Sequence, residues 1–418
     1  MKRRMNEQND LSKKKQRLKK HKLLFILKRG ENAVKSIEKK DLNKRLMNIR
    51  RSLHEHPELS FEEYETTKKL RRWLEEEGMT VLDIPALQTG VVCDIKGEQE
   101  GPTIVLRADI DALPINEASG EPFSSKIPGK MHACGHDFHT ASIFGAAVLL
   151  NERKHEIKGT VRILFQPAEE VAQGAKHVIE AGVLDGVDAI FGMHNKPDLP
   201  VGTIGIREKA LMASVDRFEI DIQGTGGHAG IPNHTVDPIA ISGQITSALQ
   251  QIVSRRISSL HHAVVSITRI QGGTSWNVIP DRVEMEGTVR TFEPEVRAMI
   301  PDLMKQIVSG IAEGFGAKAE VRWHPYLPSV MNDERLTKVV EETAGALDLT
   351  VVQAEQSPGG EDFALYQERI PGFFVWMGTS GTEEWHHPAF TLNEDALPVA
   401  AAFFAELAVR ALESRSWN

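Results

Sequence analysis

The sequence predicts an α/β fold with a mostly parallel central sheet and a second, inserted α+β domain. Short apolar runs alternate with helical stretches before about residue 214, and the order of strands and helices changes after it. Strands that alternate with helices form parallel sheets covered by those helices. A chain of 418 residues is also too long for one hydrophobic core of ordinary size, so two domains are expected.

The first forty residues are basic, with 15 Lys/Arg against 4 Asp/Glu, so they carry +11 while the remaining chain carries −19. Their apolar run LLFIL has only five residues, fewer than a signal peptide or a membrane span needs. We expect residues 1–40 to be a solvated, partly disordered extension, and we expect neither nucleic acid nor a membrane as a required partner. An arm that contacts nucleic acid or an anionic membrane is the alternative.

The chain holds two cysteines, Cys93 and Cys134, which cannot build a disulfide framework. Cys93 lies in the apolar run GVVCDI, where a buried small side chain is expected. This cysteine usage is typical of a reducing compartment, so a cytoplasmic protein is expected.

The catalytic part is expected to begin with two helices, one over 41–53 and one from about Glu62 to a stop before Gly78. Three buried strands follow, and a helix from about Asp137 separates the first two. The strands are TIVLRADID (103–111), GTVRILFQPAEE (159–170) and DAIFGMHN (188–195). Each runs directly into polar residues. Because ligands of parallel sheets bind beyond the carboxyl ends of the strands, these polar residues are predicted to share one pocket.

From residue 214 the expected order is strand, helix, strand, strand, helix, strand, as in a ferredoxin-like sandwich. The strands are expected over 215–224, 263–273, 281–292 and 317–326, with helices over 237–256 and 295–313. The earlier pattern then resumes. Residues 214–327 are therefore predicted to be an insertion in a domain made of 41–213 and 328–418.

Cys134 and His136 stand two residues apart in MHACGHDFHT. A thiolate and an imidazole at this spacing can bind one divalent ion or two adjacent ones, because both are soft or borderline donors. Alone the pair is a weak signal, and chance spacing is the alternative.

The strand ends add Glu169 and Glu170 after LFQP, and His194 after FGM. Adjacent carboxylates repel each other, so cations or protons must compensate them near a pocket. In extended backbone the two side chains diverge, so one can bind a metal while the other faces a bound water. That division suits metal-assisted hydrolysis. A solvated Glu pair that opens a helix is the alternative.

The chain resembles the amidohydrolase branch of metallopeptidase family 20. Ten segments match in order: RRSLHEHPELSFEE, LRADIDALPI, MHACGHDFHT, FQPAEE, GMHN, GTGGHAGIPNH, GTSWNVIPD, GTVRTF, GGEDF and HHPAF. The branch includes hippurate hydrolases, N-acyl-amino-acid deacylases, N-acetyl-diaminopimelate deacetylases and plant auxin-conjugate hydrolases. The resemblance runs from about residue 45 to 410. It implies a metal-dependent exopeptidase-type catalytic domain with an inserted lid or dimerisation domain.

The resemblance implies two divalent metal ions per subunit, bound by a thiol, a carboxylate and three imidazoles: Cys134, His136, Glu170, His194 and His386. It implies Glu169 as general base. His387 is the alternative to His386, because the chain reads His-His-Pro where the family usually has a histidine, a small polar residue and a proline. A thiolate ligand favours manganese, zinc, cobalt or nickel over magnesium.

Asp109 and Asp111 match an acid pair that the family places beside the metals. Asp111 is implied to orient a ligand, and a turn or helix-capping role for both acids is the alternative. His132 and His139 flank the ligands, where they either orient them or are satisfied local histidines.

Four residues are implied to contact substrate. His228 in GGHAG would polarise the scissile carbonyl, and in dimeric members of the family this histidine comes from the partner subunit. Asn277 and Arg290 match positions that bind the substrate's carboxylate, with a strand-surface charge as the alternative for Arg290. Gly360 in GGEDF is a further predicted substrate-binding position.

The expected function is hydrolysis of N-acyl-L-amino acids to a carboxylic acid and an amino acid, by a metal-activated water in a homodimer formed through the inserted domain. A carboxypeptidase or dipeptidase on short or N-blocked peptides is the runner-up, since the same machinery cleaves either amide. A cysteine hydrolase with Cys134 as nucleophile would leave Glu169 and His386 without a role. A non-catalytic metal-binding protein would leave Glu169 without one.

Overall fold

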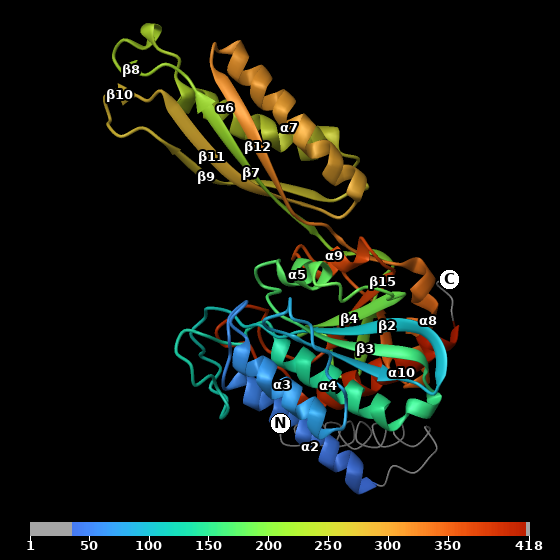
Figure 1. Ribbon diagram of the computed structural model, residues 1–418. Helices are drawn as coiled ribbons and strands as arrows, with labels where there is room; N and C mark the ends of the chain where they lie inside the picture. Colours follow the sequence, from blue (N-terminus) through green and yellow to red (C-terminus); the bar gives the residue numbers. More distant parts are fainter. Residues whose placement is uncertain (1–35, 415–418) are drawn as a thin grey trace, which may run out of the picture.

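The computed structural model describes residues 36–414, with side chains from residue 41 onward (Figure 1). Residues 1–35 of the predicted basic arm lie outside the described residues. Helix α2 (Ser36–His54) includes the last five residues of that arm, 36–40. Among the described residues, no helix is both long enough and apolar enough to cross a membrane.

The central sheet has seven strands in the order β1-β3-β2-β4-β15-β5-β14. Four of its neighbouring pairs are parallel, while β1 pairs with β3 and β15 pairs with β5 in antiparallel fashion. The prediction of a mostly parallel sheet is confirmed. The strands are β1 (Val91–Lys96), β2 (Gln99–Asp109), β3 (Lys158–Gln166), β4 (Ala189–Lys196), β5 (Thr203–Ile206), β14 (Thr350–Gln353) and β15 (Gly372–Gly378).

Helices cover both faces of this sheet, so its central strands are apolar on both sides. In β2, Ile104 and Leu106 pack into the core under the larger helical layer, whereas Val105 packs into the core under the smaller one. The larger layer holds α2, α3 (Tyr64–Glu76), α4 (His136–Glu152), α8 (Glu334–Ala346) and α10 (Leu397–Ser414). The smaller holds α5 (Gly174–Glu180) and α9 (Phe363–Gln367), on the opposite face in Figure 1.

A second sheet, in the order β12-β7-β11-β9, projects away from the first (Figure 1). All its pairs are antiparallel, and α6 and α7 pack on it around a separate hydrophobic core. Chain order here is strand, helix, strand, strand, helix, strand. The elements are β7 (Ser214–Gln223), α6 (Pro238–Gln251) with a π-helical turn (Ile252–Arg256), β9 (Ala263–Gly272), β11 (Arg282–Thr291), α7 (Pro294–Gly314) and β12 (Lys318–Leu327).

Two small sheets complete the chain. At the junction between the two large sheets, β6 (Lys209–Met212) pairs with β13 (Val330–Asn332). At the outer end of the second sheet, β8 (Gly227–His228) pairs with β10 (Val278–Ile279). Short 3-10 turns lie at Lys154–Glu156, Pro232–His234 and Glu394–Ala396.

A buried ion network joins β2 to the loop before α9. The guanidinium of Arg107 has no exposure, and its Nη atoms lie 2.6 Å from Asp109 and 2.8 Å from both Glu361 and Asp362. Its Nε donates to Gln166 Oε1 at 2.8 Å. Removing one partner of a buried ion pair leaves an uncompensated charge in a medium of low dielectric constant. Arg107 is therefore needed to keep three acids inside the protein.

We predict that Arg107→Met lowers the free energy of unfolding by about 3–5 kcal/mol, because it leaves Asp109, Glu361 and Asp362 without their cation. Urea unfolding followed by circular dichroism, in the presence of a chelator, measures this loss. Arg217→Met is the matched control. It removes an exposed pair with Glu286 at 2.6 Å and should leave the free energy of unfolding almost unchanged. Equal losses in the two variants would contradict the prediction.

Candidate metal centre and active site

The carboxyl ends of three neighbouring strands bring the predicted site residues together. Strand β2 ends at Asp109, β3 ends at Gln166 just before the Glu pair, and β4 carries His194. Helix α4 begins at His136 against the same edge, because Gly135 before it takes a left-handed conformation with φ 87°. A side chain at Gly135 would also collide with the amide of Asn195, since a Cβ would lie 2.4 Å from Nδ2.

All five predicted metal ligands converge in two groups that share Cys134. One group is Cys134, His136 and His194, and the other is Cys134, Glu170 and His386; within each, the donor atoms lie within 4.8 Å of one another. Cys134 Sγ is 3.3 Å from His194 Nε2, and Glu170 lies 3.8 Å from His136 Nε2 and 3.6 Å from His386 Nε2. The arrangement offers two adjacent cation positions.

His386 faces this site and His387 does not. Both side chains are about half exposed, at 54% and 52%, but His386 Nε2 is 3.6 Å from Glu170, whereas His387 Nδ1 is 4.0 Å from Glu383. His386 has a left-handed backbone with φ 65°, and its N–H donates to Ala133 O at 2.9 Å, which places it beside Cys134. Such strain in a non-glycine residue is held by surrounding structure and gathers at functional sites.

The donor set fits divalent cations. His136 Nε2 and Glu170 Oε1 are buried, face each other at 3.8 Å, and have no hydrogen-bond partner. Burial raises the pKa of the Cys134 thiol, and it raises the pKa of Glu170 to about 7. Burial also lowers the pKa of His194, which favours the neutral imidazole that a metal needs. Cations between these atoms would compensate the buried acids and satisfy the two unpaired atoms.

The two glutamates lie in a tight turn, so the predicted extended backbone is wrong at this point. Ala168 and Ala172 take left-handed conformations with φ 55° and 53° on either side of the pair. The carboxylate of Glu63 holds the turn, because its Oε1 accepts a hydrogen bond from Ala168 N at 2.8 Å. The pair is also not solvated, since only 9% of Glu169 is exposed.

Glu169 and Glu170 share one neighbour and differ in the others. Both carboxylates lie within 4.8 Å of a ring nitrogen of His136, but Glu170 also faces His386, whereas Glu169 also lies within 4.8 Å of Glu361 and Asp362. Burial and the charge of Glu361 raise the pKa of Glu169 well above its usual range. A carboxylate with a raised pKa beside the ligands is suited to take up a proton and release it again.

Asp111 contacts two of the candidate ligands. Its Oδ2 accepts hydrogen bonds from Ser60 Oγ at 2.7 Å and from Glu170 N at 3.0 Å. His136 Nδ1 lies 2.9 Å from Asp111 O and 3.2 Å from Oδ1. These contacts orient His136 so that Nε2 points toward the cation positions.

Asp109 and His139 form a layer beneath the site. Asp109 lies 2.6 Å from His139 Nδ1, and His139 Nε2 accepts a hydrogen bond from Asn195 N at 2.9 Å. Because both ring nitrogens of His139 are engaged by protein, His139 positions its neighbours. His132 is fully buried with neither ring nitrogen hydrogen-bonded, and burial lowers its pKa to about 4.

Sequence reasoning missed several residues that the structure places at this site. Glu361 and Asp362 belong to GGEDF and Arg107 to LRADID, two segments that were recognised without roles for these side chains. Asn195 follows His194 and donates from Nδ2 to Cys134 O at 2.6 Å. The only sequence signal for these residues is that they lie in the matching segments. Arg107 and Glu361 are 254 residues apart, and a pair so distant leaves no pattern in the neighbouring sequence.

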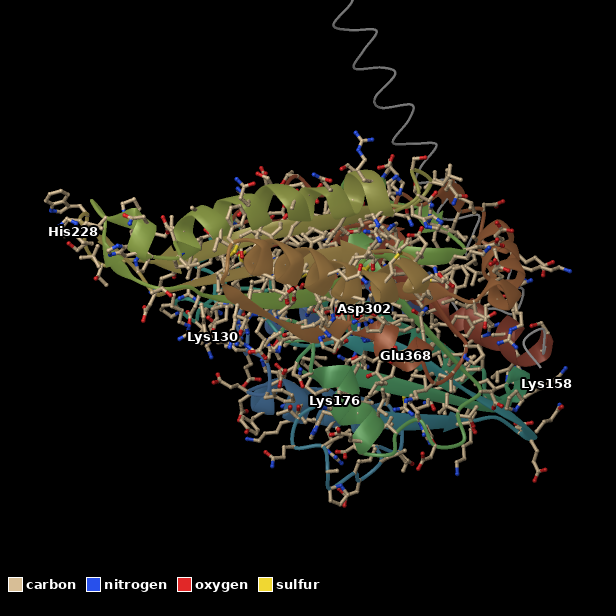
Figure 2. All side chains as sticks on the ribbon, turned by 90° about the horizontal axis from the view of Figure 1, so that it is seen from above. Lys130, Lys158, Lys176, His228, Asp302 and Glu368 are labelled. Carbon is tan, nitrogen blue, oxygen red and sulfur yellow. The ribbon has the colours of Figure 1, made fainter. Side chains whose placement is uncertain are left out.

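The predicted substrate residues fall into two places. His228 and Asn277 are exposed at the outer end of the second sheet, and Figure 2 shows His228 pointing into solvent there. Arg290 pairs in register with Val215 at the inner end. A Cβ at Gly360 would lie 2.3 Å from Val215 Cγ2, so Gly360 packs against these inner strand ends. Gly360 directly precedes Glu361 of the site, and Arg290 lies at the inner end of the second sheet, whereas His228 and Asn277 lie at its outer end.

Comparison with known proteins agrees with this geometry. The sequence profile of peptidase family M20/M25/M40 matches residues 105–410. An N-acetylcysteine deacetylase of Bacillus subtilis (strain 168) is 68% identical over 375 residues, covering 90% of this chain and 99% of that protein. Thermostable carboxypeptidase 2 of Saccharolobus solfataricus is 41% identical, covering 89% of this chain and 96% of that protein.

A solved structure has the same fold. It is the crystal structure of a Bacillus subtilis protein described as a dinuclear metal binding peptidase from the M20 family. It superposes with a TM-score of 0.84 at 64% identity, covering 90% of this chain and 99% of that chain.

We predict that His386→Ala removes about one metal ion per subunit and lowers kcat/KM at least about 100-fold, or about 2.7 kcal/mol. His387→Ala, at the next residue in sequence, should keep the metal content and activity of the wild type. Metal analysis by mass spectrometry and initial rates check both variants. The reverse result would make His387 the ligand.

We also predict that Asp111→Ala weakens metal binding about 10- to 100-fold, because it removes the carboxylate that orients His136 and Glu170. Competition with a chromophoric chelator measures the affinity. Asp94→Ala, on the distant strand β1, is the control and should leave metal affinity unchanged. If the Asp111 variant binds metal as tightly as the wild type, Asp111 does not orient the ligands.

Proposed function

Because the chain belongs to peptidase family M20/M25/M40, we propose that it removes the acyl group from N-acyl-L-amino acids, with N-acetylated amino acids such as N-acetyl-L-cysteine as first candidates. The chain is a metal-dependent hydrolase of amide bonds. One observation carries the proposal: a buried carboxylate, Glu169, lies next to the converging donors Cys134, His136, Glu170, His194 and His386. It is positioned for proton transfer and is not needed to complete either cation group.

Two divalent ions, with manganese, zinc, cobalt or nickel as candidates, would be held by the two groups that share Cys134. When bound, they would supply positive charge that acidifies water and polarises a carbonyl. Glu169 takes a proton from the water whose oxygen attacks the amide carbon. It then gives that proton to the amine nitrogen as the C–N bond breaks. The products are a carboxylic acid and a free amino acid.

Arg290 is proposed to bind the substrate's carboxylate. Its Nη1 atom is buried and has no hydrogen-bond partner. A charge on the surface of a strand would instead be hydrated, so this burial argues against the alternative interpretation of Arg290. Its partner in register, Val215, packs on Gly360, the residue before Glu361, which supports this role. A guanidinium with a free N–H fork suits a carboxylate.

His228 and Asn277 are proposed to serve the metal site of a partner subunit in a homodimer. They are exposed at the outer end of the second sheet, away from the metal site of their own chain (Figure 1). The domain formed by residues 214–327, which contains the second sheet, is thus proposed as the dimerisation domain. Two free cysteines, one of them a proposed ligand, favour the reducing cytoplasm as its location.

Carboxypeptidase action is the second candidate, favoured by the 41% identity to the carboxypeptidase. Both activities need the substrate's carboxylate, but only a carboxypeptidase requires a peptide on the acyl side. Initial rates on N-acetyl, N-benzoyl and N-blocked dipeptide substrates, each with manganese, zinc and cobalt, separate them. We expect N-acyl amino acids to be cleaved fastest. No cleavage with any metal would reject the proposed function.

We predict that Arg290→Ala lowers kcat/KM for an N-acetyl amino acid about tenfold or more, or about 1.4 kcal/mol, because the carboxylate loses its charged partner. For the matching substrate with an amidated carboxylate, the wild type should already be slow and the variant no slower. Arg217→Ala is the control: it removes an exposed ion pair with Glu286 and should leave kcat/KM on both substrates unchanged. An equal loss on both substrates would exclude carboxylate binding by Arg290.

A further inference from the structure

The outer end of the second sheet carries an apolar cluster with nothing packed on it. Trp276 is 94% exposed, and its neighbours Ile231 and Val278 are 47% and 48% exposed. We call these three residues the tip cluster. An indole buries more apolar surface than most side chains when it finds a partner, so a fully exposed one indicates a contact surface.

The backbone around the tip cluster is held by hydrogen bonds. Val278 pairs with His228 across β8 and β10, and Ala229 N donates to Asn277 O at 3.1 Å. Gly230 N donates to His228 Nδ1 at 3.0 Å. Trp276 lies in the loop between β9 and β10, next in sequence to Asn277, and this backbone is held against β8.

A second exposed apolar pair borders the metal site. Ser60 Oγ and Glu170 N donate to the same oxygen of Asp111, and Phe61 and Val171 are the residues that follow them; the Phe61 ring lies edge-on to His177 with centroids 5.8 Å apart. Phe61 is 40% exposed and Val171 is 39% exposed. Phe61 also has a left-handed backbone with φ 62°, a strained conformation that is typical of functional loops.

The tip cluster cannot reach this pair within one chain. Strand β7 runs outward from Ser214 at the junction for ten residues, about 33 Å, before β8 begins. Figure 1 shows β8 and β10 at the end of the second sheet opposite the central sheet. In a symmetric dimer, each contact between a surface of one subunit and a different surface of the other occurs twice. Such a dimer would bury the tip cluster of each subunit against Phe61 and Val171 of the other.

We propose that Trp276 of one subunit covers the acyl group of the substrate at the metal site of the other, together with Phe61 and Val171 of that site. This rests on the proposed N-acyl amino acid hydrolysis and on His228 acting across the dimer. Trp276 is then the residue that sets the preference for acyl groups. Its indole excludes water from the acyl side, and the contact grows with the length of the acyl chain.

The first test compares kcat/KM along a series of N-acetyl, N-butanoyl and N-hexanoyl derivatives of one amino acid. Trp276→Ala should lower the hexanoyl-to-acetyl ratio about tenfold, and Trp276→Phe should restore most of it. Leu260→Ala, a leucine that is 84% exposed on the same sheet domain, is the control and should leave the ratio unchanged. An unchanged ratio in Trp276→Ala would overturn the inference.

The second test asks which subunit supplies the indole. Doubly tagged heterodimers are purified from cells that express two variants. A Trp276→Ala subunit paired with a Glu169→Gln subunit has one working site, and that site receives an intact Trp276 from the other subunit. It should show the wild-type ratio. A wild-type subunit paired with a Glu169→Gln/Trp276→Ala subunit should show the altered ratio. The opposite pattern would place Trp276 in its own subunit's site and overturn the inference.

The outcomes separate this inference from the proposed function. If wild-type protein cleaves none of the series, the proposed function fails. If the wild type cleaves the series and Trp276→Ala keeps the same ratio, only the role of Trp276 fails. Metal content should stay at the wild-type level in both Trp276 variants, because the residue is exposed and touches no candidate ligand.

Discussion

The buried guanidinium of Arg107 is the interaction on which the site depends. It lies under the carboxyl ends of the central strands and pairs with Asp109, Glu361 and Asp362. These acids come from the end of β2 and from the loop before α9, more than 250 residues later. Without that cation the acids would not remain buried together, and the floor beneath the metal site would not form.

The site is layered on this floor, and each layer restricts the one above it. Asp109 fixes His139, and His139 in turn accepts a hydrogen bond from the backbone of Asn195, beside His194. Asp111 fixes His136 and the amide of Glu170. The donors of the metal site therefore point inward because of neighbours already held in place, which is the preorganisation that metal-assisted hydrolysis requires.

The two adjacent glutamates show how surroundings divide one sequence feature into two roles. Both lie near His136, but Glu170 also faces His386, whereas Glu169 is buried beside Glu361 and Asp362, which raise its pKa well above the usual range. The left-handed residues Ala168 and Ala172 enclose the pair in a tight turn. The strain of that turn is sustained by the hydrogen bond that Glu63 accepts from Ala168.

The sequence alone determined the mostly parallel sheet, the change of pattern near residue 214 and the identity of the converging donors, because periodicity and recognised segments are local properties. Tertiary structure decided what depends on distant pairing. It set the ion pairs of Arg107, the position of His386 beside Glu170, and the turn that replaced an expected extended segment at Glu169. It also separated His228 from Arg290. His228 lies beyond the outer end of the second sheet, whereas Arg290 pairs with Val215 near the junction of the two sheets.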